Sequence, residues 1–187
     1  IAASISVALE GASVEEVVAA GRACIPDDSW LGRRMDLADA ILGELSDPFE
    51  KRLYSTYLSY LETDSFSYQA DKKSDARGYL YELIKSPHAG QVFVSRTLPG
   101  ITRGNHYHHT KVEKFCVVEG RARISFRQMS TGQTYSLEVE GTECRVVDIP
   151  PGWTHNIANI GTTDLLTLFW ANEIFDPSKP DTYFAEV

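Results

Sequence analysis

The sequence predicts a mainly β chain, in which a jelly-roll barrel spans residues 78–187 and a short helical segment precedes it. From Gly78 onward, short apolar segments alternate with turns rich in Gly, Pro, Ser and Asn, as in double-sheet barrels. The segment before them, Glu62–Arg77, is polar and poor in aliphatic residues, which favours a linker. Residues 1–61 carry helix-start signals instead. We therefore expect a helical segment over 1–61, a linker over 62–77 and a β domain over 78–187.

Helix-start signals occur at three places in residues 1–61. The first, Ser13-Val14-Glu15-Glu16, has the form of a capping box and predicts a helix over about Val14–Ala20. Asp36 is the candidate cap of a second helix that runs through Leu45. At the third, Asp47 can accept hydrogen bonds from free amides and Pro48 suits the first helical position.

An apolar stripe follows this third start. Its members recur every four residues and so share one face of a helix: Phe49, Leu53, Tyr57 and Leu61. The stripe fits two interpretations. In one the helix packs on the rest of the chain, and in the other it packs on a domain or partner subunit that this chain lacks.

Nine segments of the β domain have the length and composition of strands. They are Tyr79–Leu83, Gln91–Leu98, Asn105–His109, Lys114–Glu119, Ala122–Met129, Thr134–Val139, Glu143–Asp148, Thr154–Asn159 and Asp164–Phe175. Glu119-Gly120 and Ser130-Thr131-Gly132 are candidate hairpin turns.

Alternation within Arg121–Arg127 separates two faces of one strand. Ala122, Ile124 and Phe126 fall on one face, and the residues between them are Arg123, Ser125 and Arg127. We interpret the polar face as a solvated outer surface, as in ordinary half-buried strands.

Composition excludes several classes of function. A net charge of −8 argues against nucleic acid or an anionic membrane as the main partner, and no apolar run is long enough to span a bilayer. The mildly apolar start lacks the basic residues of a signal peptide, and because it opens on Ile1 we expect a fragment of a longer protein. Cys24, Cys116 and Cys144 are odd in number and widely spaced, which favours a reducing cytoplasm over a disulfide framework.

Four of the five histidines lie in Gly100–Gly120 and Pro150–Asn159. His106 and His108 are two residues apart, so on a strand both imidazoles project from one face. Glu113 follows closely, and His155 comes from the second segment. Three imidazoles and one carboxylate suit a first-row transition metal better than calcium or magnesium. The alternative is that these are surface or core residues without a metal.

These two segments resemble the two cupin motifs. The spacing from Gly100 through His106, His108 and Glu113 to Gly120 matches the first motif at every fixed position. The second is matched by Pro150, Gly152, His155 and Asn159. One position departs: Cys144 stands where the motif has a glycine, six residues before Pro150. The departure concerns a turn rather than a ligand.

A closer resemblance covers most of the chain. Five stretches resemble the C-terminal half of the capsular polysaccharide assembling protein (CapF) family, a reductase fused to a cupin: Leu45–Leu61, Arg77–Ser95, Pro99–Val118, Val146–Gly161 and Phe169–Phe184. Residues 1–45 resemble the tail of the short-chain-dehydrogenase-like domain. The NADPH-binding half, which performs C4 reduction in that family, is absent from this sequence.

The resemblance implies a cupin that epimerises a UDP-linked 4-keto-6-deoxy-N-acetylhexosamine at C3, on a route to UDP-N-acetyl-L-fucosamine for capsule or O-antigen. It implies zinc as the metal and a homodimer as the assembly. The implied metal ligands are His106, His108, Glu113 and His155. A metal in such a site can polarise the ketone as a Lewis acid, and this acidifies the C3 proton.

The sequence defines the groups that move the proton less well than it defines the metal ligands. The candidates beside the ligands are Tyr107, His109, Lys111 and Lys114, although strict strand alternation directs Tyr107 and His109 away from the metal. The candidate substrate contacts are Thr102, Arg103 and Glu173, with Arg103 suited to the UDP phosphates. Each of these residues also has an ordinary surface or packing interpretation.

Two further functions stay open. The same four ligands holding iron would suit a cupin dioxygenase that activates O₂. A cupin that binds a sugar without catalysis is the third possibility, because this fold hosts many functions.

Overall fold

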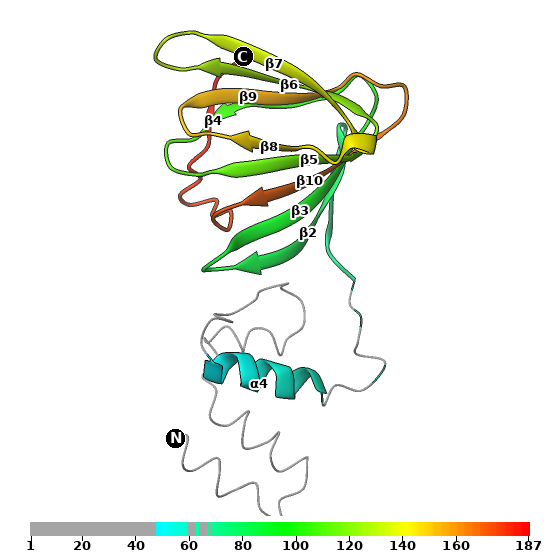
Figure 1. Ribbon diagram of the computed structural model, residues 1–187, viewed down its shortest axis with the longest axis vertical. Helices are drawn as coiled ribbons and strands as arrows, with labels where there is room; N and C mark the ends of the chain where they lie inside the picture. Colours follow the sequence, from blue (N-terminus) through cyan, green and yellow to red (C-terminus); the bar gives the residue numbers. More distant parts are fainter. Residues whose placement is uncertain (1–47, 60–62, 64–66, 68) are drawn as a thin grey trace, which may run out of the picture. The chain divides into compact units, whose positions relative to one another are not determined.

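The computed structural model describes residues 48–59, 63, 67 and 69–187 (Figure 1). The chain divides into two units, Ile1–Tyr68 and Gln69–Val187, and each is treated by itself. No helix among the described residues has both the length and the apolar character needed to cross a membrane.

The described part of the first unit is one helix, α4 (Pro48–Ser59). The predicted start at Pro48 is confirmed, and the expected role of Pro at the first helical position explains it. Leu61, the last residue of the predicted stripe, lies outside the described residues, as do the helices predicted at 14–20 and 36–45. The descent of this unit from a reductase-like domain stays a prediction.

The second unit consists of two antiparallel sheets. The larger sheet has the strand order β1-β2-β3-β10-β5-β8. Its strands are β1 (Lys72–Asp75), β2 (Gly78–Ser86), β3 (Gly90–Thr97), β10 (Leu165–Ala171), β5 (Glu113–Glu119) and β8 (Val146–Ile149). The smaller sheet has the order β11-β4-β9-β6-β7. Its strands are β11 (Tyr183–Phe184), β4 (Thr102–Tyr107), β9 (Trp153–Asn159), β6 (Arg121–Gln128) and β7 (Thr134–Glu140).

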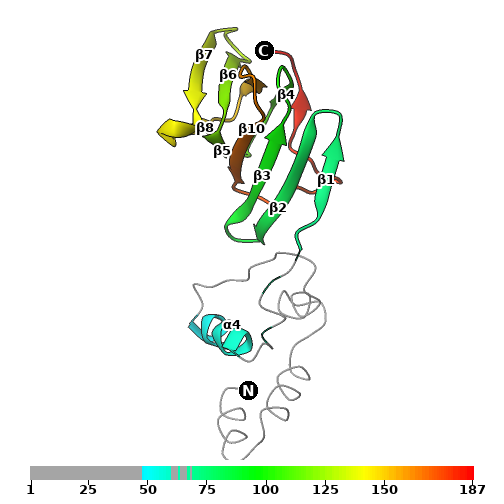
Figure 2. The same ribbon diagram turned by 90° about the vertical axis from the view of Figure 1, so that its right-hand side faces the viewer.

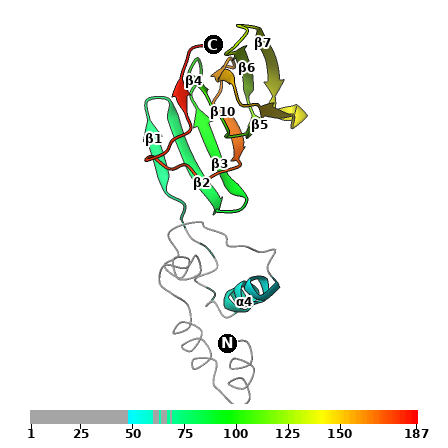
Figure 3. The ribbon, with the colours of Figure 1, turned by 90° about the vertical axis from the view of Figure 1, so that its left-hand side faces the viewer.

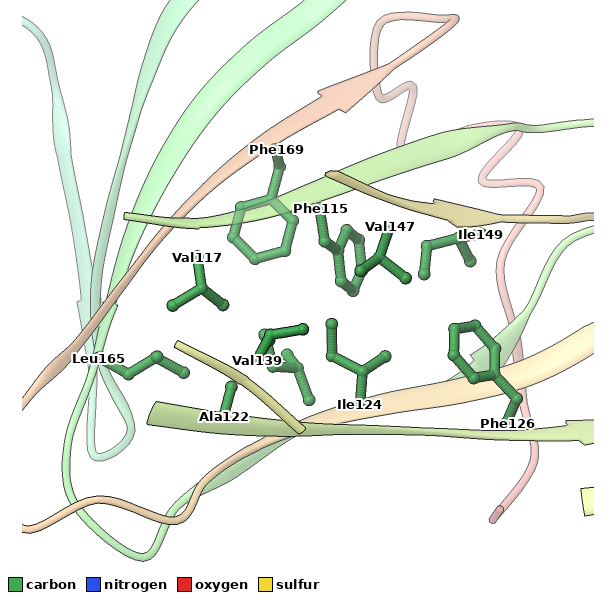
Figure 4. Packing of buried hydrophobic residues seen from close by; sticks show 11 residues of the cluster. Phe115, Val117, Ala122, Ile124, Phe126, Val139, Val147, Ile149, Leu165 and Phe169 are labelled. Carbon is green, nitrogen blue, oxygen red and sulfur yellow. The ribbon is translucent and has the colours of Figure 1, made fainter. Parts of the chain in front are cut away.

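An apolar core fills the space between the sheets (Figure 4). Phe115, Val147 and Phe169 come from the larger sheet, and Ala122 and Ile124 face them from the smaller one. Alternate residues of β5, β6 and β10 point inward, as expected for a sandwich in which each sheet has one buried face.

The predicted alternation of β6 is confirmed. Ala122, Ile124 and Phe126 are buried, whereas Arg121 and Arg123 are exposed on the outer face. Both arginines contact Glu138 of β7, at 2.6 Å from Arg121 and 2.8 Å from Arg123. Of the face predicted to be solvated, Arg123 is exposed, whereas Ser125 and Arg127 are half-buried and Arg127 donates a hydrogen bond to the carbonyl oxygen of Glu186.

The predicted turn at Glu119-Gly120 is also confirmed. Gly120 joins β5 to β6 with φ at +88°, a left-handed conformation that favours glycine. A Cβ at this position would lie 2.9 Å from the carbonyl oxygen of Asp164. The hairpin therefore needs a glycine both for its backbone conformation and for space.

Two strands lie where the sequence predicted none. β1 falls within the predicted linker 62–77, and all four of its residues are exposed. It is an edge strand held to β2 by backbone pairing (Figure 2). Because none of its side chains is buried, its sequence shows no apolar alternation that would predict a strand. The two-residue strand β11 pairs with β4 at one edge of the smaller sheet, where the C-terminal segment (red) runs beside β4 (Figure 3).

Four predicted strands have a boundary that is wrong. β2 continues to Ser86, beyond the predicted end at Leu83. β4 begins at Thr102 and ends at Tyr107, before His108. β8 begins at Val146 because Gly141–Glu143 forms a 3₁₀ turn. β10 ends at Ala171, and the chain beyond it leaves the sheet.

Candidate metal centre

The histidine-bearing strand β4 contains a β-bulge. Gly104 and Asn105 both have positive φ, at +103° and +60°, and the pairing with β9 shifts register between Gly104 and His106. A Cβ on Gly104 would lie 2.8 Å from the carbonyl oxygen of His155, so the close approach of the strands needs glycine here. The Asn105 side-chain oxygen accepts a hydrogen bond from Asn156 at 2.9 Å, which holds the bulge.

After the bulge, the ladder sets His106 directly opposite His155. The centroids of these two rings are 4.6 Å apart. His108 lies just beyond the end of β4, and its ring is 5.0 Å from that of His106 and 5.4 Å from that of His155. The two sequence segments that contain the histidines therefore meet in space.

Glu113 joins this group from the other sheet, at the first position of β5. One carboxylate oxygen lies 3.3 Å from Nε2 of His108 and 3.5 Å from Nε2 of His155. Burial raises the pKa of Glu113, but the interactions with these two imidazoles outweigh burial and hold the pKa well below its usual range. The carboxylate is therefore ionised, as a metal ligand must be.

The potential ligand atoms of all four residues lie within 4.8 Å of one another. Nε2 of His108 and Nε2 of His155 are buried and form no hydrogen bond. Burial, followed by the neighbouring His155, lowers the pKa of His106 to about 4, which keeps its imidazole neutral. Imidazole nitrogens and carboxylate oxygens are ligands that a divalent transition metal takes, so this set can hold one.

Backbone carbonyls orient two of the imidazoles. Nδ1 of His108 lies 2.5 Å from the carbonyl oxygen of Asp181, and Nδ1 of His155 lies 3.3 Å from that of Trp153. With a metal bound, a proton on Nδ1 would leave the Nε2 lone pair free for the ion. This is the arrangement by which proteins prepare histidines for metals.

The Asp181 side chain clamps the loop that follows β4. Its carboxylate accepts hydrogen bonds from the backbone amides of His109, Thr110 and Lys111 at 2.8–2.9 Å. It also accepts one from the Thr110 hydroxyl at 2.8 Å. Burial raises the pKa of Asp181, but these amides outweigh it and hold the pKa well below its usual value. Sequence reasoning missed Asp181, because no local pattern marks a contact across about 70 residues.

A pocket of about 210 Å³ adjoins the cluster, lined by His106, Glu113 and His155. Three aromatic residues of the larger sheet form its apolar wall: Phe93, Phe115 and Phe169. Its other polar lining residues are Arg77, Ser95 and Arg103. Strand alternation could have found Ser95, which lies two residues after the inward-facing Phe93 on β3.

Arg103 is held at the pocket by partners on both sides. Its Nε donates to Thr97 Oγ1 at 3.0 Å, and Nη2 lies 3.7 Å from Asp75, whose carboxylate also holds Arg77. Burial, with a smaller contribution from Arg77, lowers the pKa of Arg103, while Asp75 opposes the shift. Arginine stays protonated under such conditions, so the pocket has a cationic side.

The other predicted site residues lie outside this pocket lining. The rings of Tyr107 and His109 pack against Tyr183, and Lys114 pairs with Asp148. Thr102 is exposed at the start of β4. Their catalytic and substrate-binding roles stay predictions.

Two more of these residues contact each other. Lys111 is buried, and its Nζ lies 3.7 Å from a carboxylate oxygen of Glu173 and 3.3 Å from the hydroxyl of Thr182. The roles predicted for Lys111 and Glu173 likewise remain predictions.

Comparison with protein families matches residues 73–183 to the polysaccharide biosynthesis C-terminal domain. The match spans more than half of the chain. The chain belongs to this family. Members of one family share a fold, and the two-sheet arrangement described above is the expected mainly β cupin architecture.

The names of two similar proteins refer to a UDP-linked sugar and to a capsular polysaccharide. The chain is 48% identical over 137 residues to the UDP-2-acetamido-2,6-beta-L-arabino-hexul-4-ose reductase of Pseudomonas aeruginosa, covering 73% of this chain and 37% of that protein. It is 52% identical to the capsular polysaccharide assembling protein CapF from Staphylococcus aureus, with a TM-score of 0.75, covering 82% of this chain and 41% of that one. The chain thus spans less than half the length of either relative.

A distant likeness bears on the fold alone. Oxalate decarboxylase from Bacillus subtilis is 20% identical, with a TM-score of 0.50, covering 62% of this chain and 30% of that one. The predicted resemblance to the CapF family and the predicted cupin barrel are both confirmed.

Replacing His155 with alanine removes a ligand from the centre of the cluster. We expect the affinity for Zn²⁺ to fall by more than about a hundredfold, because loss of even an outer partner of a ligand costs tenfold to a hundredfold. Titration with a competing chelator measures the affinity. His88→Ala is the matched control, since His88 lies outside the cluster. Equal zinc affinity in both variants would contradict the assignment.

Replacing Asp181 with alanine frees the loop that positions His108. We expect about tenfold to a hundredfold weaker Zn²⁺ binding, and a smaller loss for Asp181→Asn, whose amide oxygen can still accept. Asp176→Ala is the control, because the Asp176 carboxylate caps its own turn at Ser178, 2.8 Å away. If both alanine variants bind zinc like the parent chain, Asp181 does not position the site.

Proposed function

We propose that this chain is a metal-containing epimerase that acts at C3 of a UDP-linked 4-keto-6-deoxy-N-acetylhexosamine. The observation that carries the proposal is the cluster of three histidines and Glu113 beside a pocket with a cationic side. The similarity to a reductase named for a UDP-linked hexul-4-ose and to CapF supports the choice of substrate. We further propose zinc as the metal and a homodimer as the assembly.

The cluster provides the part of the reaction that needs a cation. His106, His108, Glu113 and His155 would hold a divalent metal. Such an ion supplies a Lewis acid that polarises a carbonyl oxygen, which makes the neighbouring C–H more acidic. The aromatic wall of Phe93, Phe115 and Phe169 excludes water and strengthens electrostatic interactions within the pocket.

The remaining polar lining would bind and orient the nucleotide sugar. Arg103 and Arg77 provide guanidinium groups, whose forked donors match diphosphate oxygens. Nη2 of Arg103 and the hydroxyl of Ser95 are buried without a hydrogen-bond partner, so both have donors to offer a bound molecule. A substrate with a diphosphate at one end and a ketone at the other suits this polarity.

Proton transfer at C3 requires a base on one face of the sugar and an acid on the other. Of the four predicted candidates, Lys111 is the buried one, with its ammonium near Glu173 and Thr182. It belongs to the clamped loop, because its own backbone amide donates to the Asp181 carboxylate at 2.9 Å. We propose Lys111 as the first of the four to test, by Lys111→Met.

Epimerisation at C3 exchanges one hydrogen with solvent. Incubated in deuterated water with a UDP-4-keto-6-deoxy-N-acetylhexosamine, the zinc-loaded chain should place deuterium at C3, as read by mass spectrometry and NMR. His155→Ala should show little exchange. An unexchanged C3 with metal bound would reject the epimerase. Sugar binding without exchange would instead indicate a binding cupin, and oxygen consumption dependent on Fe(II) a dioxygenase.

Replacing Arg103 with alanine should weaken binding of UDP by about tenfold to a hundredfold, because a hydrogen bond to a charged group contributes about 1.5–3 kcal/mol. Isothermal titration calorimetry measures the affinity. Arg123→Ala is the control, since Arg123 lies on the outer face and pairs with Glu138. Unchanged binding in Arg103→Ala would place the diphosphate elsewhere.

A further inference from the structure

Cys144 has a backbone conformation that is unusual for its residue type. Its φ and ψ are +47° and +46°, the left-handed region, at the end of the 3₁₀ turn Gly141–Glu143. A β-carbon is disfavoured there, and glycine is the usual occupant. This is also the position at which the cupin motif has a glycine. The chain therefore carries a thiol where a residue without a side chain would fit more easily.

A second thiol lies next to it. Sγ of Cys116, on β5, is 3.8 Å from Sγ of Cys144, and both cysteines are free. The β5–β8 ladder holds them together, because Cys116 pairs in register with Val146, two residues after Cys144. Cys116 alternates with the buried Phe115 and Val117, so it lies on the outer face of the sheet, away from the core. Cys144 is exposed and Cys116 is half-buried.

We propose that Cys116 and Cys144 form a dithiol site that a small-molecule disulfide, such as glutathione disulfide, oxidises reversibly to an intramolecular bond. Side-chain rotation at an exposed turn can close the remaining gap between the sulfurs. The bond would tie the middle of β5 to the turn that precedes β8. Nothing in this site depends on the metal cluster or on the proposed epimerase activity.

The reaction proceeds by two thiolate exchanges. Cys144 reacts first because it is exposed: its thiolate attacks the small disulfide, forms a mixed disulfide and releases one thiolate. Burial, followed by the neighbouring Cys144, raises the pKa of Cys116, so this thiol is the slower nucleophile. After losing its proton, Cys116 attacks the Cys144 sulfur and expels the second thiolate. Two electrons pass to the small disulfide, which becomes two thiols.

The test uses the full chain with Cys24→Ser, so that only the proposed pair can react. The reduced protein is equilibrated with mixtures of reduced and oxidised glutathione, then alkylated and digested for mass spectrometry. We expect a peptide containing Cys116 linked to one containing Cys144, a mass lower by two hydrogens, and full recovery with dithiothreitol. The oxidised protein should melt higher by on the order of 5 °C, because the bond closes a loop in the unfolded chain.

Two variants separate this site from a single reactive thiol. Cys116→Ser should stop at the glutathione adduct on Cys144. Cys144→Gly should form no intramolecular bond and show no rise in melting temperature under oxidising mixtures, while glycine meets the left-handed backbone requirement. If the Cys24→Ser chain keeps two alkylatable thiols at every glutathione ratio, the proposal is overturned. Bonds formed only between chains, or only the adduct at Cys144, would overturn it as well.

Discussion

The buried carboxylate of Glu113 is the constraint on which the site end of the barrel depends. Taking an ionised carboxylate out of water costs several kcal/mol unless nearby groups compensate. Here the compensation comes across the sandwich, because Glu113 begins β5 in one sheet while His155 lies on β9 in the other. Residues such as Ile124 and Ile149 join the sheets by hydrocarbon contact elsewhere. At this end the sheets meet through polar side chains, in a geometry that hydrophobic packing alone does not require.

The C-terminal segment also holds the site end of the barrel in place, through hydrogen bonds of its backbone. The amide of Ala185 donates to the carbonyl oxygen of Asn105 at 3.0 Å, on the bulge itself. The hydroxyl of Thr154, beside His155, donates to the carbonyl oxygen of Ala185 at 2.5 Å. Together with the Asp181 clamp, these contacts hold the histidine-bearing parts of β4 and β9 from outside. Residues far from the motifs in sequence thus define the positions of the motif side chains.

The difference between side-chain contacts and backbone hydrogen bonds explains what could be predicted from sequence. Apolar alternation identified the inward residues of β6, and histidine spacing identified a cluster whose members do converge. Both signals depend on side-chain type at short range. The edge strand β1 and the Asp181 clamp depend instead on backbone hydrogen bonds to distant segments, which carry no residue signature. The bulge at Gly104 shows the mixed case, because its glycine is visible in the sequence but its register shift is not.

Among the residues that the structure describes, the buried side-chain atoms without a hydrogen-bond partner are Ser95 Oγ, Arg103 Nη2, His108 Nε2, His155 Nε2 and Thr167 Oγ1. All five lie at the cluster or its pocket or, for Thr167, directly across the ladder from Ser95. Each unsatisfied group costs about 1–3 kcal/mol, and an apolar ligand would leave every one unpaired. Two imidazole lone pairs match a cation, while a guanidinium and two hydroxyls match an oxygen-rich anion. These groups support the proposed pairing of a metal with a negatively charged substrate.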